Sequence, residues 1–180
     1  MRITENRVLA LVVCIVCAVV SVFGIGGLKL KGQYNDVTDM FVNGSDAQHN
    51  MEYYLDRGAG YAADLAYESM QYLDDDTVAY EVLELSEELM ADKGPGGERY
   101  ETYAALCRGV DKLFSELQSA GHGEEVAIEL AYYDFQSVRD LIKRDDYYAA
   151  ADEYNDTVAG FPAGLIAGIW GVGWADTFGQ

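Results

Sequence analysis

Proline, cysteine and positive charge are all scarce in this sequence of 180 residues. With 2 prolines and no sustained alternation of apolar and polar residues, the chain does not have the pattern of a β-rich fold. Of the 3 cysteines, Cys14 and Cys17 lie inside an apolar run and Cys107 stands alone, so the rest of the chain has no disulfide framework. Lysine and arginine total 12 against 31 aspartates and glutamates, giving a formal net charge of −19.

This negative charge bears on the class of partner. It would repel the phosphates of a nucleic acid, and the sequence contains no basic stripe to offset that repulsion, so we predict no nucleic-acid partner. Two interpretations of the excess carboxylates stay open. They keep the protein soluble, in a salty medium for example, or they attract a cationic partner.

Histidine is equally scarce, with 2 in the chain. Asp46 and His49 are three residues apart, and His122 and Glu125 repeat that spacing in reverse. A di-iron bundle uses two Glu-x-x-His pairs plus two more glutamates, which this sequence does not supply. The glycines of residues 93–97 lack the Lys-Ser/Thr of a phosphate-binding loop. We therefore predict a non-enzymatic protein with no metal and no cofactor.

Residues 8–28 form a run of 21 residues without a charge, and a helix needs ~20 such residues to cross a bilayer. Arg7 precedes the run and Lys29 and Lys31 follow it, which suits the headgroup region at both ends. The alternative is a cleaved signal peptide, with small residues for cleavage at 24–27. The full length and the following lysines favour an uncleaved single-pass anchor. The flanking positive charges are nearly balanced and lean slightly toward a domain outside the cytoplasm.

Downstream, apolar residues recur every three or four positions, the spacing of amphipathic helices. The stripe from Met51 to Leu73 is rich in small residues, which is typical of a closely packed helix pair. Residues 43–46 indicate a turn into a helix N-cap, and residues 92–97 indicate a loop. The apolar stripe changes phase near Asp145, which fits either a bend or one long adjusted helix.

These patterns predict an all-α fold: an N-terminal transmembrane helix followed by an antiparallel up-and-down bundle of roughly four or five helices with short connections. The predicted organisation is a short tail (1–7), the transmembrane helix (8–28), an acidic helical bundle (33–160) and an apolar tail rich in glycine and tryptophan (161–180).

The apolar tail has two features spaced by four residues. Gly160, Gly164 and Gly168 would line one face of a helix and permit close approach of another helix. Trp170 and Trp174 suit a membrane interface. The tail therefore either lies at the membrane and against the anchor, or packs on the end of the bundle.

The segment YNDTVAGFPAGLIAGIWG (154–171) resembles the C-terminal signature of the LemA family, in which Tyr-Asn precedes Phe-Pro and a Leu-Ile/Val-Ala-Gly run follows. QYND at 33–36 is similar to the family's Tyr-Asn at the start of its first long helix. Residues 43–69 depart from the family because they lack its Pro-Asn, and Tyr147-Tyr148 stands where a further Tyr-Asn is usual. The matching positions are Tyr154, Asn155, Phe161, Pro162, Leu165, Ile166, Ala167, Gly168 and Gly171.

The resemblance implies one membrane helix, a long-helix antiparallel bundle and no established catalysis. We expect the signature residues to close the fold. Tyr154 and Phe161, seven residues apart, would face the same neighbour. Asn155 would cap or bridge a facing backbone group, and Pro162 would end the long helix.

The function predicted from the sequence is a membrane-anchored scaffold or adaptor of the cell envelope. Its expected partners are the lipid bilayer and either another protein or a second copy of this chain. The alternative is a helical module that binds a cation or ligand through its acidic surface, with His49 and His122 as its polar centres.

Overall fold

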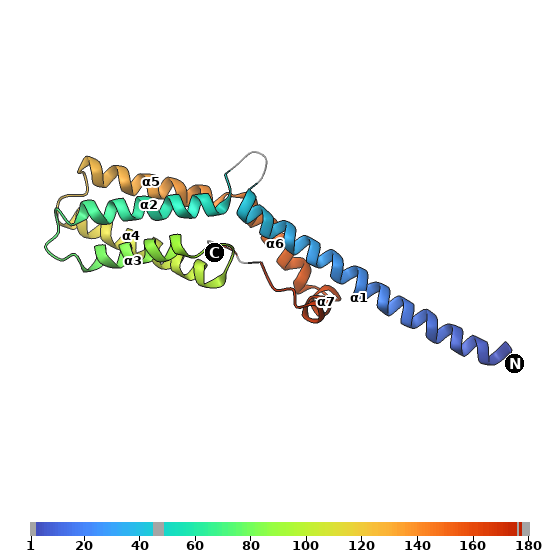
Figure 1. Cartoon of the computed structure of the whole chain (residues 1–180). Coiled ribbons are helices and arrows are strands. Elements are labelled where there is room, and N and C mark those ends of the chain that lie inside the picture. The colour runs from blue at the N-terminus through green and yellow to red at the C-terminus, as the bar shows by residue number, and fades with distance from the viewer. Residues whose placement is uncertain (1–2, 45–48, 176, 178–180) are drawn as a thin grey trace.

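The computed structural model describes residues 3–44, 49–175 and 177, and the helices are the only regular elements in these ranges (Figure 1). The predicted all-α class is confirmed. The helices are α1 (Ile3–Asn43), α2 (Met51–Ser69), α3 (Thr77–Ala91), α4 (Gly97–Ser119), α5 (Val126–Lys143), α6 (Asp146–Ala159) and α7 (Ala163–Trp170).

Helices α2 to α5 form an up-and-down bundle in which consecutive helices run in opposite directions (Figure 1). Small residues bring α2 close to its neighbours, as the sequence predicts. Ala59 and Ala62 are fully buried, and a Cβ on Gly58 would lie 3.4 Å from Val138 of α5. The predicted loop at 92–97 separates α3 from α4.

The change of phase near Asp145 is a complete break between α5 and α6. The Asp145 carboxylate accepts a hydrogen bond from the backbone N–H of Tyr147 at 2.9 Å and so caps the start of α6. Burial raises the pKa of this carboxyl. The break lets α6 leave the bundle and lie beside α1 (Figure 1).

Helix α1 is a single helix of 41 residues, which begins inside the predicted tail 1–7 and continues past the predicted end of the anchor at residue 28. Upstream of Phe23 its apolar side chains are exposed, from Leu9 to Val22. From Phe23 onward one face packs against α6 and α7. We call the residues of this face the α1 stripe: Phe23, Gly27, Leu30, Tyr34, Val37 and Phe41. Successive residues of the stripe are four and three positions apart in turn, which is the spacing of a coiled coil.

Within the described residues, α1 is the one helix that is long and apolar enough to cross a membrane. Its most apolar window has a mean hydropathy of 2.9, and none of that window is buried. These properties fit a membrane anchor and also an N-terminal signal sequence.

Replacing Phe41 with alanine tests whether α1 belongs to the folded core. The Phe41 side chain is fully buried, and its ring centroid lies 5.3 Å from that of Tyr147. We expect Phe41→Ala to lower the free energy of unfolding by about 3–5 kcal/mol, because it leaves a cavity at the core. The measurement is urea unfolding of the full chain in detergent, followed by circular dichroism.

Val42→Ala is the control, since Val42 is 38% exposed, and its expected cost is below about 1 kcal/mol. Equal effects of the two substitutions would mean that the C-terminal half of α1 does not contribute to the core.

Candidate functional site

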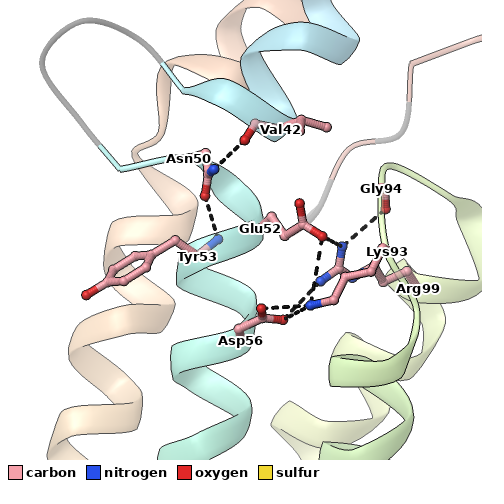
Figure 2. Close-up of polar contacts among 8 residues, drawn as sticks. All are labelled: Val42, Asn50, Glu52, Tyr53, Asp56, Lys93, Gly94 and Arg99. Carbon is pink, nitrogen blue, oxygen red and sulfur yellow. Dashed lines mark hydrogen bonds and ion pairs between the residues drawn. The ribbon is translucent and has the colours of Figure 1, made fainter.

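A buried arginine lies where α1, α2 and α4 meet (Figure 2). The Arg99 side chain is completely buried in the first turn of α4, with its Cζ 5.6 Å from the ring centroid of Phe41. Its Nη2 lies 3.4 Å from Asp56 Oδ1, and its Nη1 lies 3.7 Å from Glu52 Oε1. Nη1 also donates to the carbonyl of Gly94 at 3.3 Å, in a loop where Gly94 adopts a φ of 87°.

The charges of this cluster balance. Lys93 Nζ donates to both carboxylate oxygens of Asp56, at 2.7 and 2.9 Å, so two cations face two carboxylates. Burial lowers the pKa of the Arg99 guanidinium, and the carboxylates of Glu52, Asp56 and Asp92 oppose that change. The ion pairs of Arg99 and Lys93 with Glu52 and Asp56 link the start of α4 and the loop before it to α2.

Asn50 joins α1 to α2 beside this cluster (Figure 2). Its Oδ1 accepts from the backbone N–H of Tyr53 at 2.7 Å, and its Nδ2 donates to the carbonyl of Val42. The N-cap of α2 is therefore Asn50, downstream of the turn at 43–46 predicted from the sequence.

Tyr154 and Asn155 of α6 hold the C-terminal segment in place. Tyr154 Oη donates to the carbonyl of Gly173 at 2.9 Å. Asn155 Nδ2 donates to the carbonyl of Ala175 at 2.8 Å, and Asn155 Oδ1 accepts from the N–H of the same residue at 2.8 Å. Asn155 thus makes the backbone bridge expected of it. The Tyr154 ring also lies 5.7 Å from that of Tyr34, so the tyrosines of both Tyr-Asn pairs meet.

Two expectations for the signature residues are wrong. Phe161 is 90% exposed whereas Tyr154 is buried, so these side chains do not face one neighbour. Gly160 is extended and caps the end of α6, so the chain changes direction before Phe161. Pro162 does not end the long helix, because α6 already ends at Ala159; it precedes α7.

The predicted glycine face is also wrong. Gly160 lies outside α7, so the three glycines do not share one helix face, and of the three only Gly164 lies close against another helix, α6. A Cβ on Gly164 would meet the Val158 carbonyl oxygen at 2.6 Å, and Gly168 has open space.

Between α1 and α7, the glycines that permit a close approach belong to α1. A Cβ on Gly27 would lie 2.0 Å from Trp170 Nε1, and one on Gly26 would lie 3.0 Å from Ile166 Cδ1. Trp170 Nε1 donates to the carbonyl of Phe23 at 2.9 Å. From the sequence, these glycines suggested only small residues for the alternative of a cleaved signal peptide, since nothing local indicates a partner so far along the chain. We call this contact the glycine notch.

A groove of about 340 Å³ lies between α2 and α5. Three carboxylates, two tyrosines and three apolar residues line it, and none of the lining residues is lysine or arginine. Tyr67 is 59% exposed and Leu130 is 61% exposed. The residues of this acidic groove are Tyr61, Asp64, Tyr67, Glu68, Ala127, Leu130, Ala131 and Asp134.

The two histidines lie at opposite ends of α2. His49 stacks on Tyr53 with ring centroids 4.2 Å apart, and His122 packs on Tyr72 with centroids 4.8 Å apart. Helix α2 has 19 residues, or about 28 Å, so the histidines do not form one site. Asp46 lies outside the described residues. Among the residues that are described, no three His, Cys, Asp or Glu side chains are grouped to hold a metal.

Cys107 is buried in α4, and burial raises the pKa of its thiol. A raised pKa disfavours the thiolate, which is the nucleophilic form of cysteine. This environment is that of a packed core residue.

Together, the fold and these sites define an all-helical protein with an apolar N-terminal helix and an acidic bundle. Comparison with protein-family models, with curated proteins and with solved structures found no match.

Neutralising the partners of Arg99 tests the charge-balanced cluster. In the double variant Glu52→Gln/Asp56→Asn, we expect the free energy of unfolding to fall by roughly 2–4 kcal/mol, because a buried guanidinium loses its carboxylates. Urea unfolding measures the change. Glu84→Gln/Glu87→Gln, which neutralises two carboxylates of α3, is the control; a loss no larger than this control's would show that the cluster does not stabilise the joint.

Removing the Asn155 side chain tests the tail contact. We expect Asn155→Ala to increase amide hydrogen exchange of residues 171–175 by about tenfold, since it removes two hydrogen bonds to Ala175. Exchange in α2 to α5 should not change. The matched control is Asp156→Asn at the exposed neighbouring position. Unaltered exchange of the tail in Asn155→Ala would contradict a holding role for Asn155.

Proposed function

We propose that this chain is a LemA-like single-pass membrane protein whose acidic bundle serves as a non-catalytic scaffold or adaptor. The observation that carries the proposal is the continuity of α1, whose exposed apolar half runs without a break into the α1 stripe. A bundle built on its own anchor keeps a fixed relation to the membrane, which suits a protein that positions a partner there.

The glycine notch supports an uncleaved anchor. Cleavage within residues 24–27 would remove the Phe23 carbonyl that accepts from Trp170. It would also detach Phe23, the first residue of the α1 stripe, from the rest of the stripe. A cleaved signal peptide has no need to pack against the mature protein.

The LemA-like assignment rests on the signature residues quoted above. The contact between Tyr34 and Tyr154 gives the two Tyr-Asn segments a shared physical role, since it joins α1 to α6. The hydrogen bonds of Asn155 give the second pair a role in holding the tail. These are roles in folding, in agreement with a protein that performs no catalysis.

The acidic groove is the surface we assign to the partner, which we propose to be a cationic protein segment. The three carboxylates that line it attract lysine or arginine side chains, and the exposed ring of Tyr67 suits such cations as well. A second copy of this chain is a poorer occupant because it brings the same negative surface. A small cation held by the same carboxylates is the alternative.

Photo-crosslinking in membranes tests this assignment. A photoreactive phenylalanine at position 67 of the full-length chain should form discrete crosslinks, and the crosslinked peptide should contain a lysine- or arginine-rich segment. Position 80 on α3 is the matched control, because Tyr80 is 62% exposed and lies outside the groove. Adding Asp64→Asn, Glu68→Gln and Asp134→Asn should reduce the crosslinks about tenfold or more.

Equal yields from positions 67 and 80 would contradict a specific groove. Crosslinks to this chain itself would replace the adaptor with a self-associating protein. If position 67 gives no crosslink, and divalent cations stabilise the chain through the same three carboxylates, the cation-binding alternative holds.

A further inference from the structure

We propose that α7 and the segment after it, to Ala175, lie in the bilayer interface as a second membrane contact beside α1. This inference rests on the proposed function, because it needs α1 to span the membrane. We call residues 161–175 the interfacial foot.

The depth of the glycine notch places the foot at the membrane boundary. Residues 8–26 are uncharged and helical, and at 1.5 Å per residue they are about 28 Å long, which is close to the ~30 Å of a bilayer core. The contact of Gly26 and Gly27 with α7 therefore falls at the end of the span. Lys29 and Lys31 follow at the depth of the headgroups.

The foot exposes an apolar surface that nothing in the described structure covers. Ile166 and Ala167 face inward and are buried, whereas the side chains on the opposite side of α7 point away from the protein. Exposed apolar residues of α1 at the same depth extend this surface. The exposed fractions are 90% for Phe161, 53% for Leu165, 64% for Ile169 and 61% for Trp174, with 68% for Ile25 and 63% for Leu28 on α1.

Charge separates the foot from the rest of the protein. Residues 161–175 contain no charged side chain, in a chain whose net charge is −19. The acidic bundle is unsuited to contact with anionic headgroups, whereas a neutral apolar segment with two tryptophans is suited to the boundary between headgroups and acyl chains. Lipid is the occupant we assign, because the exposed apolar half of α1 continues directly into this surface.

The foot is held in position by contacts of Trp170 and of Ala175. Trp170 is bonded to the Phe23 carbonyl at the glycine notch, and Ala175 is bonded to Asn155. A preorganised foot loses little conformational entropy on contact with lipid. Two membrane contacts, α1 and the foot, would fix the tilt of the bundle, which a lone span leaves variable.

Tryptophan fluorescence tests the inference directly, because Trp170 and Trp174 are the only tryptophans. The full chain and a Trp174→Phe variant, both of which keep the Trp170 contact that holds the foot, are reconstituted in phosphatidylcholine vesicles with and without bromine on the acyl chains. The difference between their emissions is the contribution of Trp174. We expect bromine to reduce Trp174 emission at least about twofold, and aqueous acrylamide to quench it weakly.

Two charge insertions, each made with and without Trp174→Phe, provide the matched pair. Ile169→Glu places a carboxylate on the foot, and Leu130→Glu places one on α5, where the original side chain is 61% exposed. Ile169→Glu should restore acrylamide quenching of Trp174, and Leu130→Glu should leave it unchanged. Circular dichroism confirms that both variants are folded.

Flotation of the vesicles separates the possible failures. If the protein floats with the vesicles but acrylamide quenches Trp174 and bromine does not, the foot is wrong and the anchor stands. If the protein does not float, the proposed anchor fails as well. A third result is that neither quencher reduces the Trp174 emission and that this emission changes as the lipid-to-protein ratio is raised. That result would show that a second copy covers the foot, and it would overturn the assignment to lipid.

Discussion

The packing of α1 against α6 and α7 is the interaction on which the rest of the structure depends. Helix α1 has an exposed apolar half and a half that packs against other helices. From Leu9 to Val22 its side chains are mostly apolar and exposed on all sides, and from Phe23 onward the α1 stripe packs against the protein. A break between the two parts would let the bundle pivot. The unbroken α1 instead carries the direction of its exposed half to the stripe on which α6 and α7 pack (Figure 1).

The packing of the helices leaves few charged side chains in the core. The chain carries 31 acidic residues, yet Asp145 is the one carboxylate buried among the described residues, and there it caps a helix. The buried Arg99 is matched by Glu52 and Asp56 at the joint of α1, α2 and α4 (Figure 2). Asp64, Glu68 and Asp134 line the acidic groove, where we propose that they meet a cationic partner.

The C-terminal segment combines two kinds of contact. Hydrogen bonds from Tyr154 and Asn155 satisfy backbone groups near residue 175, and packing at the glycine notch holds Ile166 and Trp170 of α7 against α1. This division gives an apolar segment a place in an otherwise acidic protein. Its inner face completes the fold, and its outer face stays exposed, as a surface in contact with lipid would be.

Local patterns were enough to predict much of the fold. The spacing of apolar residues predicts the helices, the glycines of 92–97 predict the loop, and the uncharged run from residue 8 predicts an apolar helix. These predictions succeed because helices and turns depend on residues a few positions apart. Asn155 was also interpreted correctly, since a side-chain amide in that position needs a backbone partner.

The sequence by itself determined the helical class, the negative charge of the bundle and the length of the apolar run. Only the tertiary structure decided which glycines permit a close approach, that Phe161 is exposed and that the two histidines lie apart. Trp170 meets the Phe23 carbonyl across a separation of 147 residues, and no local spacing contains that information. Contacts of this kind arise when helices pack, because the neighbours of a side chain are then set by the path of the whole chain.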